Sequence, residues 1–113
     1  MKIAFSTKGN SWDSQMDARF GRADMFLIYD EESDTLKEVA NDETESMEHG
    51  VGPQTTKKIV GLGANIIITG NGAGNKALEV LKSFNAKMYV GAGDMTVKEA
   101  YDAYKNGQLK TQF

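Results

Sequence analysis

Two segments in the second half of the chain each combine a strand pattern, a glycine-rich turn and a helical pattern, in that order. Residues 65–69 form a β-branched run, the glycine-rich residues 70–75 follow, and apolar residues then recur at helical spacing. Residues 87–90 and 91–94 repeat this order, and residues 96–99 have the form of a capping box at a helix start. Because such units pair in parallel through right-handed connections, this half predicts a parallel α/β arrangement.

The first half of the chain predicts strands with no helix between them. Residues 2–6 alternate, residues 25–29 form a continuous apolar run, and residues 36–40 alternate again, as expected of an edge strand. Pro53 stands where a helix begins, and Gly63 ends the helical pattern that follows. The predicted order is β-β-β-α-β-α-β-α, in which an antiparallel meander precedes the parallel units.

The composition limits the classes of function. The chain has 113 residues, 40% hydrophobic and 26% charged, which fits one globular domain over residues 1–113. It contains no cysteine, which excludes disulfides, thiolate-held iron–sulfur clusters, cysteine zinc sites and cysteine nucleophiles. The net charge is −3, no apolar run approaches about 20 residues, and no signal peptide is recognisable. We therefore expect a cytoplasmic protein that binds neither nucleic acid nor membrane.

The predicted topology brings the long loops to one edge of the sheet. Residues 7–24 leave the first strand at its carboxyl end, and residues 41–52 leave the third strand at the same edge. The turns 70–75 and 91–95 leave the parallel strands at that edge too. Ligands bind at the carboxyl edge of an open α/β sheet. Cations and helix starts gather there, so an anionic ligand is expected. The cationic or titratable candidates are Lys8, Arg19, Arg22, His49 and Lys76.

The glycine-rich turn is the first candidate for holding such an anion. It contains Gly70, Asn71, Gly72, Gly74 and Asn75, and it lacks the spacing of a dinucleotide fingerprint or a Walker loop. Cradling an anion and a purely conformational role are about equally compatible with this pattern.

The sequence Arg19-Phe20-Gly21-Arg22 places two guanidinium groups in one loop. Their forked donors match anions with several oxygen or sulfur atoms. Taken alone, the motif favours the simpler interpretation of a solvated loop whose Phe20 ring enters the core. His49, which Gly50 follows, is the only histidine of the chain. An imidazole is a metal ligand or a proton carrier, although a histidine in a polar loop is usually just exposed.

Catalysis is disfavoured by what the motifs lack. Asp13, Asp17 and Asp24 resemble the carboxylate set of a metal-dependent nuclease, but such enzymes need acidic residues in the central strands, and residues 2–6 contain none. With one histidine and no motif around a serine, a Ser–His–Asp triad is not indicated either.

Several segments taken together resemble the dinitrogenase iron–molybdenum cofactor biosynthesis family. They are MKIAFSTKG, ARFGRADMFLIYD, the HGVG helix entry, GANIIITGNGAGNKALEVLK and AKMYVGAGDMTVKEA, and they cover nearly the whole chain. The family includes carriers of nitrogenase cofactor precursors and the orange protein, and this chain looks most like its small stand-alone members. The resemblance implies a ribonuclease H-like three-layer α/β/α fold with a five-stranded mixed sheet.

The resemblance also implies a function. It is the non-covalent binding, without catalysis, of an iron–molybdenum–sulfur or molybdenum–copper–sulfur cluster, or its precursor, at the loop edge of the sheet. A protein partner in cluster assembly and a monomer or weak dimer are expected with it. The implied site comprises Arg19, Phe20, Gly21, Arg22, His49, Gly50, Gly70, Asn71, Gly72, Gly74 and Asn75, with His49 as the metal ligand.

One departure from the family pattern keeps an alternative open. The family often has His-Phe-Gly-Arg where this chain has Arg19-Phe20-Gly21-Arg22, so an imidazole is replaced by a guanidinium. Arg19 retains charge and N–H donors for a sulfide-rich anion. The loss of the imidazole also fits an interaction or regulatory module with a vestigial cluster site.

Overall fold

The computed structural model describes residues 1–40 and 51–112, with residues 51–54 described through their backbone alone. It has a mixed α/β fold in which six strands form one mixed sheet with the order β3-β2-β1-β4-β5-β6. The strands are β1 (Lys2–Thr7), β2 (Met25–Asp30), β3 (Thr35–Ala40), β4 (Ala64–Ile68), β5 (Lys87–Val90) and β6 (Lys110–Thr111). The helices of the described residues are α1 (Val51–Gly61), α2 (Asn75–Ser83) and α3 (Val97–Lys105).

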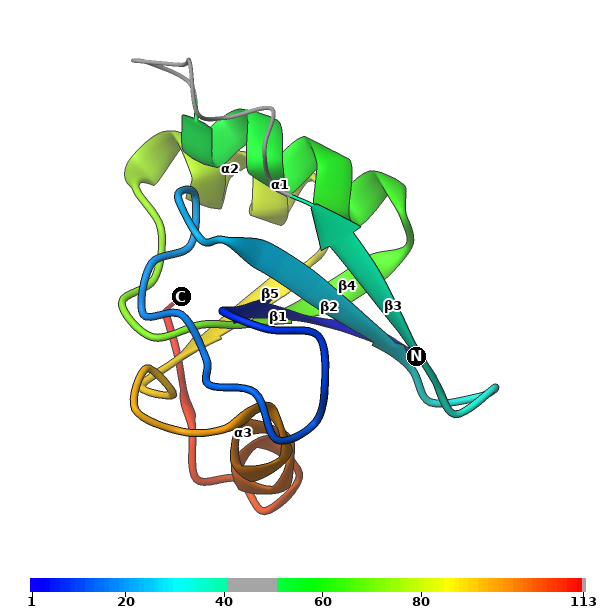
Figure 1. The fold of residues 1–113 in the computed structure, drawn as a ribbon. Coiled ribbons are helices and arrows are strands. Elements are labelled where there is room, and N and C mark those ends of the chain that lie inside the picture. The colour runs from blue at the N-terminus through cyan, green and yellow to red at the C-terminus, as the bar shows by residue number, and fades with distance from the viewer. Residues whose placement is uncertain (41–50, 113) are drawn as a thin grey trace.

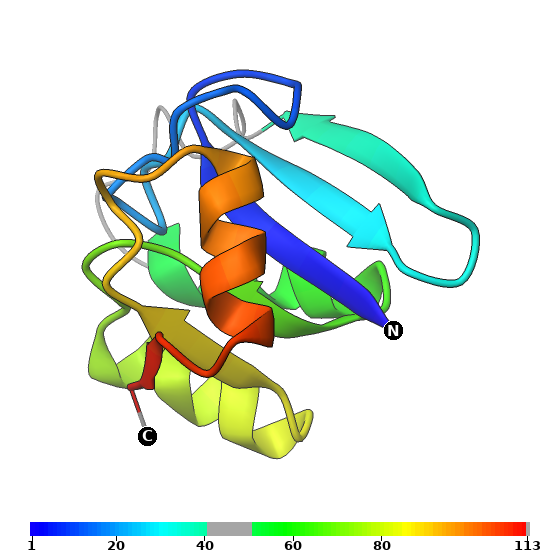
Figure 2. The same cartoon turned by 90° about the horizontal axis from the view of Figure 1, so that it is seen from below.

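Helices cover both faces of the sheet. α1 and α2 lie side by side on one face, and α3 crosses the other (Figure 1; Figure 2 gives the view from below). Successive side chains of β1 point to opposite faces of the sheet, as the two-residue period of a strand requires. Ala4 packs in the buried cluster beneath α1 and α2, whereas Ile3 and Phe5 pack in the cluster beneath α3. This alternation makes β1 the centre of both cores.

The predicted meander and parallel units are both confirmed. β1 pairs antiparallel with β2, β2 pairs antiparallel with β3, and β1, β4 and β5 run parallel. β3 lies at the edge of the sheet, as its alternating pattern predicted. The carboxyl ends of β1, β4 and β5 therefore lie at one edge, here called the rim. Among the described residues, no helix combines the length and apolar character needed to cross a membrane.

The expectation of five strands was wrong, because β6 adds a sixth. Its residues Lys110 and Thr111 are exposed and pair antiparallel with Val90 and Tyr89. A two-residue strand has no detectable period, and neither residue is apolar, so the hydrophobic pattern gave no signal for it. Its pairing nevertheless returns the end of the chain to the sheet.

α3 begins with the capping box that the sequence predicted. Thr96 Oγ1 accepts a hydrogen bond from the Glu99 N–H at 3.2 Å, and Glu99 Oε1 accepts one from the Thr96 N–H at 2.9 Å. We expect Thr96→Ala to lower the free energy of unfolding by about 1 kcal/mol, because a first-turn amide loses its partner. Urea unfolding measures the loss, and Thr96→Ser, which keeps the hydroxyl, is the control. Equal losses in both variants would contradict a capping role.

Candidate functional site

Three of the four predicted loops meet at the rim, and the fourth falls mainly on residues 41–50, outside the described residues. The loop of residues 8–24 is tied to the turn after β4 by the Asn71 N–H, which donates to the Ala18 carbonyl oxygen at 2.8 Å. It is tied to the turn after β5 by the Met16 N–H, which donates to the Met95 carbonyl oxygen at 2.9 Å. The convergence inferred from topology is therefore confirmed for the described loops.

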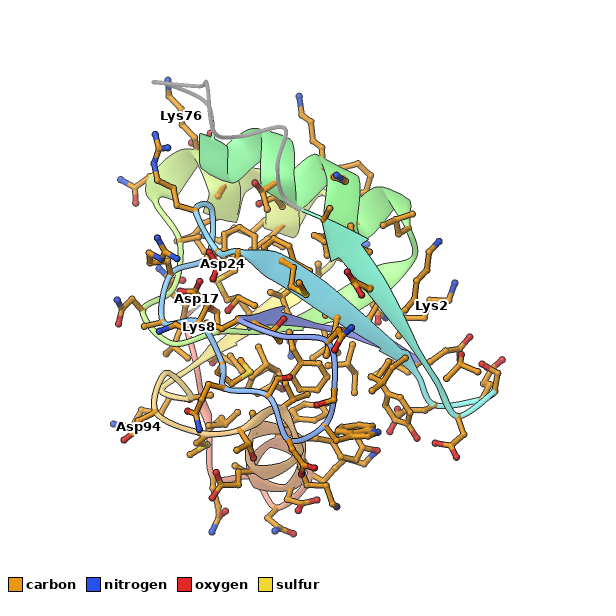
Figure 3. All side chains as sticks on the ribbon, in the orientation of Figure 1. Lys2, Lys8, Asp17, Asp24, Lys76 and Asp94 are labelled. Atoms are coloured by element: carbon orange, nitrogen blue, oxygen red, sulfur yellow. The ribbon has the colours of Figure 1, made fainter. Side chains whose placement is uncertain are left out.

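Carboxylates as well as cations lie at the rim. Figure 3 shows Lys8 and Lys76 at the same edge as Asp17, Asp24 and Asp94, while Lys2 lies at the opposite edge. An anionic ligand would therefore need to be held where the cations are not already matched by carboxylates.

The close approach of three backbone segments joins the rim loops. A Cβ atom on Gly70 would lie 2.6 Å from the Ala18 Cα atom and 2.8 Å from the Gly93 Cα atom. The Gly91 N–H also donates to the Gly70 carbonyl oxygen at 3.0 Å. Gly70 is thus needed for the close contact of the three loops, which supports the conformational interpretation of the first glycine in the motif.

An open pocket of about 330 Å³ lies between the arginine loop and the turn before α2. It brings together two motifs that are about fifty residues apart in the sequence. The residues that line it are Arg19, Phe20, Gly21, Arg22, Gly72, Ala73 and Gly74. The two motifs that the sequence singled out therefore share one concave surface.

The other predicted site residues have different places. Gly70 and Asn71 hold the loops together, and Asn75 is the first residue of α2. His49 and Gly50 lie outside the described residues, so the structure does not test the predicted metal ligand.

Phe20 anchors the arginine loop to the core. Its side chain is buried and packs edge-on against Phe26, with ring centroids 5.6 Å apart. The expectation that its ring enters the core is therefore confirmed, and Phe20 also lines the pocket from this anchored position.

The starts of α2 and α3 differ as anion sites. The N-terminal amides of α3 are partly satisfied by Thr96 and by the Glu99 carboxylate, which already places a negative charge there. The N-cap of α2 is Gly74, which has no side chain to cap the helix and which lines the pocket. Free first-turn amides favour anions, so of these two helix starts that of α2 is better suited to a ligand.

A buried carboxylate organises the arginine loop. The Asp17 side chain is only 2% exposed, whereas that of Arg19 is 54% exposed. Arg19 Nε donates to Asp17 Oδ1 at 3.0 Å, and Arg19 Nη2 donates to Asp17 Oδ2 at 2.8 Å. The backbone N–H groups of Arg19 and Asp24 donate to the same carboxylate at 3.0 and 3.1 Å. Asp17 therefore fixes the turn through four donors.

These donors control the ionisation of Asp17. Burial alone would raise the pKa of its carboxyl, but the hydrogen bonds from Arg19 and Asp24 and the charge of Arg19 outweigh burial, and the pKa falls below the ordinary value of 3.8. Conversely, the side-chain hydrogen bonds and charge of Asp17 raise the pKa of Arg19. Arg19 is thus an ion-paired arginine at the pocket, with its charge largely balanced from within the loop.

From the sequence, Asp17 is singled out only as one of three aspartates that resemble the carboxylate set of a metal-dependent nuclease. The signal for its actual role was the Asp-x-Arg spacing, since residues two apart in a turn readily exchange side-chain and backbone hydrogen bonds. Among residues 1–40 and 51–112, no group of three or more histidine, aspartate or glutamate side chains is placed to hold a metal ion. The described part of the pocket is suited to binding an anion through N–H donors.

Comparisons with known proteins find relatives that match almost the whole chain. The model of the family described as "Dinitrogenase iron-molybdenum cofactor" matches residues 1–107. An uncharacterised protein of Methanocaldococcus jannaschii is 30% identical over 112 residues, which cover 97% of this chain and 90% of the relative.

Two solved structures are similar over almost the whole chain. The apo form of the orange protein from Desulfovibrio gigas has a TM-score of 0.90 at 28% identity, covering 96% of this chain and 90% of that one. A Thermotoga protein of the DUF35 family, provisionally described as a NifB protein, has a TM-score of 0.80 at 37% identity, with the same coverage.

Proposed function

The chain belongs to the dinitrogenase iron–molybdenum cofactor family, and we propose that it is a non-catalytic binding or carrier protein for an anionic metal–sulfur cluster or its precursor. The observation that carries the proposal is the pocket between the arginine loop and the turn before α2. One wall presents Arg22 beside the ion-paired Arg19, and the other presents Gly74 at a helix start without a side-chain cap. Both walls favour negative charge.

The donor chemistry favours holding a whole anion over coordinating its metal. The chain has no cysteine, and the described residues contain no cluster of metal-ligating side chains. Guanidinium and backbone N–H groups instead donate hydrogen bonds to the outer atoms of an anion. An iron–molybdenum–sulfur or molybdenum–copper–sulfur cluster, as the family resemblance implies, presents sulfide atoms on its outside and would be bound non-covalently as cargo.

Anaerobic titration with tetrathiomolybdate, with and without copper(I), tests the proposal. Visible absorption gives the stoichiometry, and gel filtration shows whether the colour elutes with the protein and whether the protein changes its oligomeric state. We expect stoichiometric co-elution. If folded wild-type protein takes up neither tetrathiomolybdate nor the copper-containing species, thiometallate binding is excluded. The alternative is then an interaction module with a vestigial site.

We expect Arg22→Ala to weaken thiometallate binding by about tenfold, the effect of one charge-assisted hydrogen bond. Arg22 is exposed and lines the pocket, and its replacement leaves the Asp17–Arg19 pair intact. Lys87→Ala is the matched control, because it removes one positive charge at the start of β5, at the sheet edge opposite the rim. Equal affinities in both variants would show that the pocket is not the binding site.

His49→Ala tests the predicted metal ligand separately. If His49 binds metal, the variant will lose affinity for the copper-containing species and keep its affinity for tetrathiomolybdate alone, since imidazole is a ligand for copper. Equal losses for the two ligands would indicate that His49 contributes charge or hydrogen bonding instead.

A further inference from the structure

The side-chain amide of Gln112 is bonded to the glycine-rich wall of the pocket. The Ala73 N–H donates to Gln112 Oε1 at 2.9 Å, and Gln112 Nε2 donates to the Ala73 carbonyl oxygen at 2.7 Å. Both hydrogen-bonding groups of the Ala73 backbone are therefore bound by one planar amide. This is the pairing that a neighbouring strand would supply, made here by a side chain.

Gln112 is itself held by the sheet. It follows β6, and its own N–H donates to the Met88 carbonyl oxygen of β5 at 2.9 Å. The chain thus runs from the edge strand β6 directly to the middle residue of the pocket wall formed by residues 72–74.

The wall is shaped to receive this amide. A Cβ atom on Gly72 would lie 2.4 Å from Gln112 Oε1, and Gly72 has a φ of +86°, which disfavours residues with a side chain. Ala73 faces the core cluster beneath α1 and α2, while Gly72 and Gly74 flank it in the wall. Fixing Ala73 therefore fixes the backbone on both sides of it, including the N-cap of α2.

We propose that Gln112 is a positioning residue that holds the 72–74 wall of the pocket in its binding geometry. The geometric part stands on the contacts above, and the effect on ligand affinity rests on the proposed function. No local pattern indicates this role for Gln112, because the residue is about forty positions from the wall and its placement depends on β6.

Amide hydrogen exchange by NMR tests the geometric part without any ligand. In Gln112→Ala we expect the Ala73 amide to exchange roughly tenfold faster, because its acceptor is lost, while the Ile67 amide in the central strand β4 stays unchanged. Gln108→Ala is the matched control, since Gln108 is an exposed glutamine near the same end of the chain. Unchanged exchange at Ala73 in a folded Gln112→Ala protein would overturn the proposal.

Gln112→Glu separates the two hydrogen bonds. The carboxylate keeps an acceptor for the Ala73 N–H, but it places its second oxygen against the Ala73 carbonyl oxygen, where Gln112 has a donor. Because these two acceptors repel each other, the pairing should break, and we expect Ala73 exchange close to that in Gln112→Ala. Tetrathiomolybdate titration of these variants then tests the coupling, with an expected loss of affinity of about fivefold to tenfold. Faster exchange with unchanged affinity would overturn the positioning role for binding. A wild-type protein that binds no thiometallate would contradict the proposed function, and Ala73 exchange would still decide whether Gln112 fixes the wall.

Discussion

Gly70→Ala is expected to lower the free energy of unfolding by about 3 kcal/mol, because the new methyl group meets backbone on two sides. The nearest atoms would be the Cα atoms of Ala18 and Gly93, at 2.6 and 2.8 Å, and the Ala18 carbonyl oxygen, at 3.0 Å. None of these is the end of a flexible side chain, so relief requires that the loops move apart. Separation would also strain the hydrogen bonds that Asn71 and Gly91 make at this contact.

Thermal and urea unfolding of Gly70→Ala measure this effect, with an expected fall in Tm of roughly 10–15 °C for a domain of this size. Gly61→Ala is the matched control. A Cβ atom at Gly61 meets nothing within 4 Å, and the residue is the last of α1, so the same substitution should be neutral or stabilising by a few tenths of a kcal/mol. Similar stabilities for the two variants would show that the rim loops do not depend on close packing at Gly70.

The regular elements could be predicted because each has a local signal. The central strands are short apolar runs, and the glycine-rich turns mark where they end. The capping-box pattern of Thr96 and Glu99 marks the start of α3. Right-handed connection of these elements then fixes which edge the loops share. The two-residue β6 has no such signal, because its residues are polar and its existence depends on meeting β5.

The candidate site could be predicted only in part, for the same reason. The sequence pointed to the arginine loop and the glycine-rich turn, and the pocket contains both. It could not show that Arg19 is paired with a buried Asp17. Nor could it show that the backbone of Ala18 and Gly93 lies close to Gly70, or that Gln112 is hydrogen-bonded to Ala73. Each of these contacts is set by tertiary distance, which no local pattern contains.

Asp17→Asn is expected to lower the free energy of unfolding at neutral pH by roughly 2–3 kcal/mol. Asparagine retains one acceptor oxygen, whereas the carboxylate accepts from the Arg19 side chain and from the backbone N–H groups of Arg19 and Asp24 through two. The substitution also removes the negative charge that pairs with Arg19. The loss stays below that of a fully buried ion pair, because the Arg19 side chain is 54% exposed and regains contact with water.

The effect depends on pH with a defined sign. The folded state holds the pKa of Asp17 below the ordinary 3.8, so ionised Asp17 stabilises the protein above that value. This contribution is lost as the pH falls through the folded-state pKa, because the unfolded chain then binds a proton more readily than the folded one. The difference in stability between wild type and Asp17→Asn should therefore be largest at neutral pH and should narrow as the pH falls below 3.8.

Urea unfolding of both proteins from about pH 7 to about pH 2.5 measures that difference across the relevant range. Asp24→Asn is the matched control, because Asp24 lies 3.4 Å from the same guanidinium but is 59% exposed, so its loss should be within about 0.5 kcal/mol. If the difference in unfolding free energy between wild type and Asp17→Asn stays constant with pH, the carboxylate acts through hydrogen-bond geometry and not through its ionisation.

If that difference narrows as expected, the guanidinium of Arg19 is held by its ion pair with Asp17. Weaker ligand binding in Arg19→Ala would then reflect a disturbed turn as well as a lost cation. Arg22 also lines the pocket and does not belong to that pair, so the effects of Arg22→Ala and Arg19→Ala on ligand binding should differ.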